Sequence, residues 1–185
     1  METLAKTVNG FDQEAIAGVV AALQNNPEIG NFELRATNQW IDGAHNRSYV
    51  QDFYGAGQED TSRTVPFIYD NDEPPVLLGT NKGANPGEVL LHGLLGCMTT
   101  AMVLLAAARG IKIGAVSSRV EGDIDIKGFL GMAPHGVKGF QQIRVTFDIE
   151  GVDEAQKQEL LTLAKQSPLY NSLIHPMDVQ VALKE

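Results

Sequence analysis

The stretch Pro86-Gly-Glu-Val-Leu-Leu-His-Gly-Leu-Leu-Gly-Cys-Met-Thr-Thr100 opens a long apolar run that ends near Ala108. The run is about as long as a membrane-spanning helix needs to be. The histidine, threonines and glycines inside it, together with the strand-rich and acidic remainder of the chain, argue against a membrane helix. A helix that is apolar all round in a soluble protein is expected to be buried on all sides, at the centre of a domain or between two subunits. We therefore predict a buried central helix, and the same pattern fits a homodimer interface.

The composition predicts one soluble globular domain. Its 185 residues, of which 43% are apolar and 20% charged, can bury a substantial core. The formal charge of -9 and the scattered positions of the 14 Lys and Arg residues argue against a nucleic-acid surface, so the expected partner is a small molecule or a protein. Residues 1–6 contain no apolar stretch long enough for a signal peptide, and a single cysteine cannot form an internal disulfide. We expect a cytoplasmic protein.

Before the central run, the sequence predicts one helix and three strands. Apolar residues fall at helical spacing in Asp12–Gln24, which predicts an amphipathic helix. Alternation from Phe32 to Trp40 is typical of a half-buried strand. A second strand from Ser48 to Tyr54 would complete a hairpin with residues 45–47 at its tip, and Val65–Tyr69 would supply a third strand.

After the central run, two more alternating segments predict a second hairpin. They span Val116–Ile126 and Ile143–Ile149, with a glycine-rich loop between them. A helix is expected from Asp153 to Pro168, and the chain closes on a strand at Val179–Leu183. Strands, buried helix, strands, helix and strand give an α+β order, without the regular alternation of a doubly wound sheet.

Five motifs, in their order along the chain, resemble those of the OsmC/Ohr family. They are His45-Asn-Arg-Ser48, Asp72-Glu-Pro-Pro-Val-Leu-Leu-Gly79, Asn85-Pro-Gly-Glu-Val-Leu-Leu-His-Gly-Leu-Leu-Gly-Cys97, Glu121-Gly-Asp-Ile-Asp-Ile-Lys-Gly-Phe-Leu-Gly131 and Ser167-Pro-Leu-Tyr-Asn171. The resemblance divides the chain into an N-terminal helical extension, residues 1–30, and an OsmC-like domain, residues 31–185. It implies antiparallel sheets wrapped around a long buried central helix, in an intertwined homodimer with active sites at the subunit interface.

The resemblance also implies a thiol peroxidase that acts on organic hydroperoxides. Cys97, the one cysteine in the sequence, matches the attacking cysteine of the family. Arg47 matches the activating arginine, and Glu88 lies one place from the activating glutamate. Ser167 stands where the family has its resolving cysteine, in a Cys-Pro step. Without a second cysteine no internal disulfide can form, so an external thiol would have to reduce the oxidised Cys97.

The chemistry explains why these residue types would be needed together. Only a thiolate attacks the peroxide oxygen, so a cation near the thiol is required, and Arg47 can supply it. Glu88 can orient that guanidinium by a bidentate pair. On a straight helix, however, Glu88 and Cys97 lie on opposite faces and roughly 13 Å apart along the axis. Either the site is shared across the dimer, which we favour, or the helix begins after Glu88.

Each candidate residue also has a purely structural interpretation. Cys97 can be inert packing on an apolar helix, and Arg47 can be a solvated charge. Glu88 can complement the helix dipole and bond free backbone N–H groups. His92 is about 140° around the helix from Cys97, which is a poor position for a base, and we expect a buried histidine satisfied by a hydrogen bond.

We expect no metal and no cofactor. The four histidines, at positions 45, 92, 135 and 175, show no metal-ligand spacing. The glycine-rich loop lies between strands, without the strand-to-helix setting that a nucleotide-binding motif needs.

Two functions stay open at this point. The first is a one-cysteine peroxidase that prefers apolar hydroperoxides, with Leu94, Met98 and Tyr170 at the mouth of its site. The second is a dimeric module that binds a small apolar or thiol-bearing ligand, or senses redox state, without peroxidase turnover. A cysteine hydrolase is a distant third, because no histidine can be placed beside Cys97.

Overall fold

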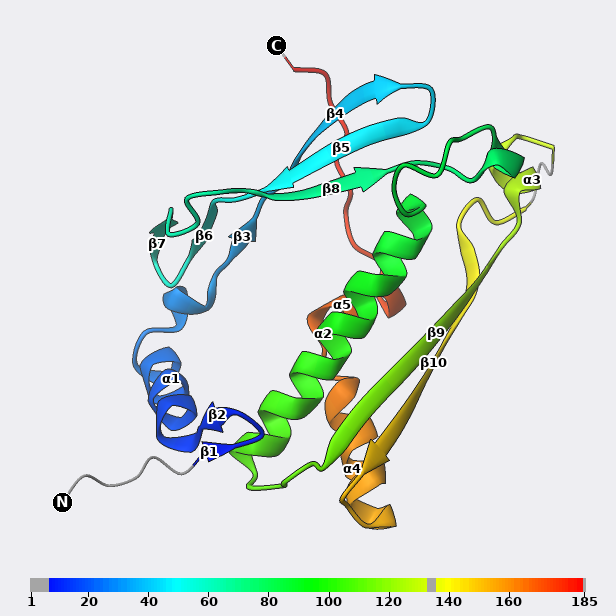
Figure 1. Ribbon diagram of the computed structural model, residues 1–185. Coiled ribbons are helices and arrows are strands. Elements are labelled where there is room, and N and C mark those ends of the chain that lie inside the picture. The colour runs from blue at the N-terminus through cyan, green and yellow to red at the C-terminus, as the bar shows by residue number, and fades with distance from the viewer. Residues whose placement is uncertain (1–6, 133–135, 185) are drawn as a thin grey trace. The chain divides into compact units, whose positions relative to one another are not determined.

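The computed structural model describes residues 7–132 and 136–184 (Figure 1). The chain divides into two compact units, which we describe separately. The strand unit comprises residues 14–90, and the central-helix unit comprises the described residues 7–13, 91–132 and 136–184. The division expected from the sequence, with a boundary after residue 30, stays a prediction.

The strand unit holds two antiparallel sheets of three strands each. The first has the strand order β3-β6-β7 and the second has the order β4-β5-β8. Their bounds are Glu33–Leu34 for β3, Thr37–Asp42 for β4, His45–Val50 for β5, Phe53–Gly55 for β6, Gln58–Asp60 for β7 and Phe67–Asn71 for β8. The same stretch of chain contains helix α1 (Gln13–Asn25) and the short 3-10 helices η1 (Pro27–Gly30) and η2 (Pro75–Leu77).

Two strands expected from the sequence are each divided between the two sheets. The alternation from Phe32 to Trp40 is split into β3 and β4, and the expected strand from Ser48 to Tyr54 is split into β5 and β6. β3 pairs with β6, whereas β4 pairs with β5. Alternation continues through residues 35–36, so a period of two does not reveal the change of sheet. The expectation of a half-buried strand is wrong for β4, because all its residues are exposed in this chain.

Residues 45–47 lie inside a strand rather than at a hairpin tip, which corrects the sequence prediction. The turn contains Gly43, whose φ of 54° favours glycine. β5 is the middle strand of its sheet, with β4 on one side and β8 on the other. The helix expected at Asp12–Gln24 and the strand expected at Val65–Tyr69 are confirmed as α1 and β8, with ends shifted by one or two residues.

The central-helix unit is built around helix α2, which begins at Pro86, just inside the strand unit, and ends at Ala108. Its other described elements are β1 (Thr7–Val8), β2 (Phe11–Asp12), β9 (Ala115–Ile124), α3 (Ile126–Phe129), β10 (Phe140–Glu150), α4 (Glu154–Ala164) and α5 (Pro168–Ile174). β9 and β10 form the predicted second hairpin, which is long and antiparallel and runs alongside α2 (Figure 1).

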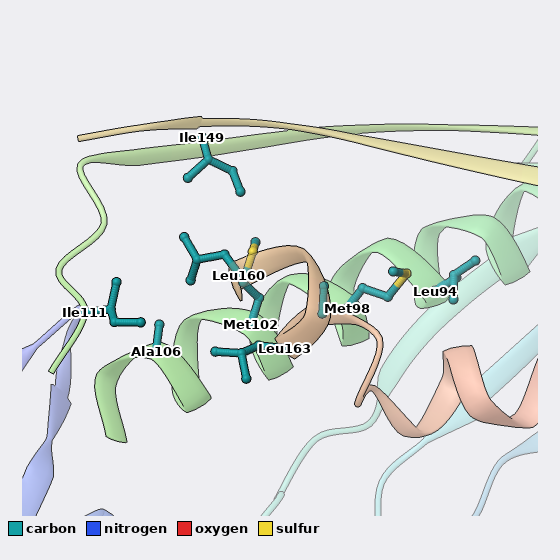
Figure 2. Packing of buried hydrophobic residues seen from close by; sticks show 9 residues of the cluster. Leu94, Met98, Met102, Ala106, Ile111, Ile149, Leu160 and Leu163 are labelled. Atoms are coloured by element: carbon teal, nitrogen blue, oxygen red, sulfur yellow. The ribbon is translucent and has the colours of Figure 1, made fainter. Parts of the chain in front are cut away.

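One stripe of α2 forms part of the core. Its buried residues recur every fourth position: Leu94, Met98, Met102 and Ala106. Figure 2 shows this stripe together with Ile149 of β10 and with Leu160 and Leu163 of α4. The prediction of burial on all sides is wrong for the single chain, because much of the remaining surface of α2 is half-buried or exposed. By length and composition, α2 is the one helix in the described residues that could cross a membrane, a test that a core helix of a soluble protein also passes.

The chain after β10 forms two helices and then a tail. α4 starts where the sequence predicts, because Asp153 and Gln156 form a capping box. The structure adds α5, which the sequence analysis missed. The strand expected at Val179–Leu183 is wrong, since the described residues 175–184 contain no strand. Its alternating apolar side chains are exposed, because none of the strands that the structure describes pairs with it.

Asn9, between β1 and β2, holds the segment that follows α2. Its Nδ2 donates to the carbonyl of Ile111 at 2.9 Å, and its Oδ1 accepts from the N–H of Ile113 at 2.9 Å. Gln13 donates from Nε2 to the carbonyl of Ala107 at 2.7 Å. The last carbonyls of a helix have no partner inside the helix, and Gln13 adds an outside donor to one of them. The N-terminal segment therefore stabilises the end of the central helix.

Replacing Asn9 with glycine is expected to lower the Tm by about 4–8 °C, since it removes two hydrogen bonds of roughly 1 kcal/mol each. Glycine keeps the left-handed backbone, with φ of 51°, that this position adopts. Asn81→Gly is the matched control, because Asn81 has a φ of 55° and an exposed side chain. Thermal unfolding followed by circular dichroism measures both variants, and an equal loss in the two would contradict the assignment.

Candidate functional site

Cys97 lies at the edge of the buried stripe of α2. It is half-buried and carries a free thiol. Its neighbours Leu94 and Met98 are buried, and on an ideal helix Cys97 is about 60° around the axis from Leu94. Within the described residues, no hydrogen bond engages its sulfur. The thiol is therefore partly accessible, and its chemistry is not suppressed by a fixed partner in the central-helix unit.

Arg47 forms a fixed ion pair in the strand unit, with Asp70. Its Nε donates to Oδ1 of Asp70 at 2.8 Å, and its terminal NH2 donates to Oδ2 at 3.1 Å. These two parallel bonds are the fork that suits a guanidinium and a carboxylate. Hydrogen bonds first from Arg47 and then from His45 hold the pKa of Asp70 below its usual range, and the carboxylate raises the pKa of Arg47.

His45 completes this cluster on the same side of the sheet. Its Nε2 is 2.8 Å from Oδ1 of Asp70, and the residue is 8% exposed. Its Nδ1 is buried and has no hydrogen-bond partner in the part of the chain that the structure describes. Asp70 thus accepts hydrogen bonds from two basic side chains, which fixes the guanidinium of Arg47 relative to the sheet.

The register of the β4-β5-β8 sheet brings this cluster together. Arg47 lies directly opposite Asp70 in the antiparallel pairing of β5 with β8. His45 and Arg47 are two residues apart on β5 and therefore point to the same face. The sequence analysis missed Asp70. The available signal was a carboxylate near the end of the strand predicted at Val65–Tyr69, but its partner depends on the register.

Glu88 caps the N-terminus of α2. Its Oε2 accepts from the backbone N–H of Asn85 at 3.0 Å, while Oδ1 of Asn85 accepts from the N–H of Gly87 at 2.7 Å. This reciprocal arrangement differs from a capping box only in that the side chain of Asn85 bonds the second helical residue instead of the third. The possibility that the helix begins after Glu88 is therefore wrong, since α2 begins at Pro86. Within the strand unit, the carboxylate that pairs with Arg47 is Asp70 rather than Glu88.

Cys97 and Arg47 belong to different units, so their meeting stays a prediction, and so do the catalytic roles of Cys97, Arg47 and Glu88. What the structure describes is the local setting of each side chain. Cys97 is a partly accessible thiol on a packed helix, Arg47 is an oriented guanidinium, and Glu88 is bonded to the first turn of α2.

The loop that leads into α2 is held by Asp72, which is 1% exposed. Oδ2 of Asp72 accepts from the hydroxyl of Thr80 at 2.7 Å and from the N–H groups of Thr80 and Lys82 at 3.1 and 3.0 Å. Oδ1 accepts from the N–H of Glu73 at 2.8 Å. These bonds hold the pKa of Asp72 far below its usual range. A Cβ at Gly79 would lie 1.8 Å from the carbonyl oxygen of Glu73, so the loop closes around Asp72 with no space for a side chain there.

The end of this loop, from Gly79 onward, and helix α2 lie within a stretch that matches a known family. The family model described as OsmC-like protein matches residues 79–182, which is more than half of the chain. The chain belongs to the OsmC-like family. A comparison with curated proteins gave no match.

Solved structures of OsmC-like proteins share the fold. An OsmC-like protein from Mycoplasma pneumoniae is 21% identical, with a TM-score of 0.57, and the match covers 77% of this chain and 87% of that one. A protein from Legionella pneumophila described as an organic hydroperoxide resistance protein OsmC is 18% identical, with a TM-score of 0.53, covering 75% and 88% of the two chains. The predicted α+β fold with antiparallel sheets and a long central helix is confirmed. The homodimer stays a prediction.

Ser167, where the OsmC/Ohr resemblance expects a resolving cysteine, starts helix α5. Its side chain is fully buried, and its Oγ accepts from the N–H of Tyr170 at 3.3 Å. Pro168 follows at the first helical position, where its missing N–H costs nothing. A serine before a proline is a helix-start signal, and it could have predicted α5 from the sequence.

A cavity of about 500 Å³ lies beside α2 in the central-helix unit of this OsmC-like chain. The three residues that the sequence analysis placed at the mouth of a site, Leu94, Met98 and Tyr170, line it together. The remaining lining comes from β10, from α5 and from the end of α4. Cys97 does not line this cavity, although it lies next to Met98 in the chain.

The histidines differ from expectation in one case. His92 is exposed, so the prediction of a buried histidine is wrong. It lies on a side of α2 that the single chain leaves uncovered. His135 falls outside the described residues. Among those that are described, no three His, Cys, Asp or Glu side chains gather where they could hold a metal ion, and the expected lack of a metal stays a prediction.

Proposed function

We propose that this OsmC-like protein is a one-cysteine peroxidase that reduces organic hydroperoxides with the help of an external thiol. The observation that carries the proposal is the partly accessible thiol of Cys97, unengaged within the described residues, on the same helix as Leu94 and Met98, which line a largely apolar cavity. The name of the Legionella structure, an organic hydroperoxide resistance protein, supports the same chemistry for a protein of this fold. An apolar lining favours apolar hydroperoxides over hydrogen peroxide.

The proposed reaction has two stages. The thiolate of Cys97 attacks the terminal peroxide oxygen, the O–O bond breaks, and the departing alkoxide takes up a proton and leaves as an alcohol. Sulfur is thereby oxidised to a sulfenic acid. An external thiol then attacks that sulfur, which releases water and leaves a mixed disulfide. A second thiol attacks the external sulfur, which frees the Cys97 thiolate and carries the oxidation away as a disulfide.

Arg47 supplies the positive charge in this proposal, and it does so as a preoriented group. Asp70 holds the guanidinium through Nε and one terminal nitrogen, which leaves further N–H donors of Arg47 for the thiolate or the peroxide. A guanidinium fixed in advance loses little side-chain entropy when it binds an anion. We assign Glu88 a supporting role at the start of α2, where it fixes the first turn of the helix that carries Cys97.

We also propose an intertwined homodimer in the cytoplasm, with the reactive residues meeting at the subunit interface. The exposed apolar side chains of β4, Trp40 and Ile41, and those of the tail, Val179, Val181 and Leu183, support an assembly, because large exposed apolar side chains that gather on a surface often mark an interface. Analytical ultracentrifugation of the full chain measures the oligomeric state, and a monomer would contradict the proposed dimer.

Single-turnover oxidation tests the peroxidase. Reduced protein is mixed with cumene hydroperoxide or hydrogen peroxide, and Cys97 is followed by sulfenic-acid trapping and intact mass, with Cys97→Ser as the control. We expect stoichiometric trapping that is faster with the organic peroxide. Oxidation of Cys97 no faster than that of a free thiol such as glutathione would contradict the proposed peroxidase function.

The second candidate is an OsmC-like module that binds a small ligand or senses redox state without turnover. The observation that favours it is that Cys97 does not line the 500 Å³ cavity. An unreactive thiol together with ligand binding in that cavity would establish this function in place of the first.

A further inference from the structure

The walls of the cavity beside α2 are mostly apolar. Leu94 and Met98 line it from α2, Val145 from β10, and Leu173 and Ile174 from α5. Its volume of about 500 Å³ is within the range of sites that bury small organic ligands, roughly 300–1,000 Å³. Walls of this kind favour a hydrocarbon chain.

An irregularity in β10 falls among the residues that line the cavity. The pairing of β10 with β9 shifts between Phe140 and Gln142, so Gln141 has no partner across the hairpin. The ring of Phe140 lies over Gly122, where a Cβ would come within 2.5 Å of it. Both Phe140 and Gln141 line the cavity.

The charge at the cavity comes from a single residue. Lys165 lines it, and no carboxylate does. The ammonium of Lys165 has no ion-pair partner within the residues that the structure describes. As the cap of α4, Lys165 also complements the helix dipole, but that role would be met equally by a side chain that points away from the cavity. In a chain with a formal charge of -9, one cation beside an apolar cavity selects locally for an anion.

We infer that this cavity binds an acyl carboxylate, with the hydrocarbon chain between α2, β10 and α5 and the carboxylate on Lys165. For catalysis the inference rests on the proposed function, since Lys165 would then select hydroperoxides that carry a carboxylate over neutral ones. Binding itself needs no thiol chemistry. Lys165 is a specificity-determining residue in this assignment.

Isothermal titration calorimetry on the full-length Cys97→Ser protein tests the site with decanoate and, as a neutral probe with the same chain, decan-1-ol. We expect one decanoate per chain and weaker binding of decan-1-ol. Lys165→Met should raise the Kd for decanoate about tenfold, because it removes one partly exposed charge-assisted contact. The Kd for decan-1-ol should stay unchanged. Lys157→Met is the matched control, because Lys157 lies on the same helix and faces Glu154 at 3.8 Å.

Two further variants place the ligand in the cavity. Val145→Trp fills the cavity from β10, and Ile174→Trp fills it from α5 at a position that is more than half exposed and tolerates a larger side chain. Both should abolish binding of both probes while circular dichroism shows a folded protein. Absence of decanoate binding, or binding that survives Ile174→Trp, overturns the site. Equal loss in Lys165→Met and Lys157→Met overturns the role of Lys165.

The outcome is separable from that of the peroxidase test. Decanoate binding without rapid Cys97 oxidation retains the acyl site and rejects the peroxidase. Rapid oxidation without decanoate binding retains the peroxidase and rejects the acyl site.

Discussion

Arg47→Ala is expected to slow the single-turnover oxidation of Cys97 by cumene hydroperoxide by about 100-fold at pH 7, the usual cost of losing one preorganised charge-stabilising donor. A free thiol with a pKa of about 8.5 is only a few per cent thiolate at this pH. The proposed function assigns Arg47 the task of stabilising the attacking thiolate and the peroxide oxygens. Stopped-flow mixing followed by quenched alkylation and intact mass measures the rate.

The control for lost positive charge is Arg119→Ala. Arg119 is an exposed partner of Glu121 in an ordinary surface ion pair, so its removal should change the rate less than twofold. The oxidation rate of Asp70→Asn should lie between the rates of Arg47→Ala and Arg119→Ala. This variant keeps the guanidinium of Arg47 but weakens the two hydrogen bonds that orient it. Equal rates in Arg47→Ala and the unmodified protein would remove Arg47 from the reaction and leave Cys97 to act alone.

Asp72→Asn is expected to lower the Tm by about 5–10 °C, because the amide has one accepting oxygen where the carboxylate uses two. Whichever way the amide turns, its NH2 faces at least one of the N–H donors of Glu73, Thr80 and Lys82. Asp178→Asn is the control, since Asp178 lies in the exposed tail. Differential scanning calorimetry measures both variants.

The same variant should change the response of stability to pH. The pKa of Asp72 is lowered in the folded protein, so its contribution to stability is present above the unfolded-state pKa of about 3.9 and is lost as the pH falls toward the folded value. The gap in Tm between the unmodified protein and Asp72→Asn should therefore be widest at neutral pH and shrink below about pH 4. A gap that is constant down to pH 3 would show that the ionised carboxylate does not stabilise the loop.

Local signals in the sequence were sufficient for several parts of this protein. The helical period located α1 and α2, the cap formed by Asp153 and Gln156 located α4, and alternation located the β9–β10 hairpin. These signals work because the groups that interact lie within a few residues of one another. The single cysteine likewise made Cys97 the candidate for any thiol chemistry, and the motifs around it predicted the family that the comparison confirms.

Tertiary structure decided the partners. Asp70 meets Arg47 across a sheet register that joins residues 23 positions apart, and a strand pattern shows which face a side chain takes but not which strand lies beside it. The change of sheet after β3 was hidden for the same reason, because alternation continues unbroken while the hydrogen-bond partner changes. The cavity and its lysine depend on α2, β10, α4 and α5 packing together, and no local period encodes the space left between them. The sequence thus determined most of the elements and the position of the single thiol, whereas packing between distant segments determined which charges face one another and where the cavity lies.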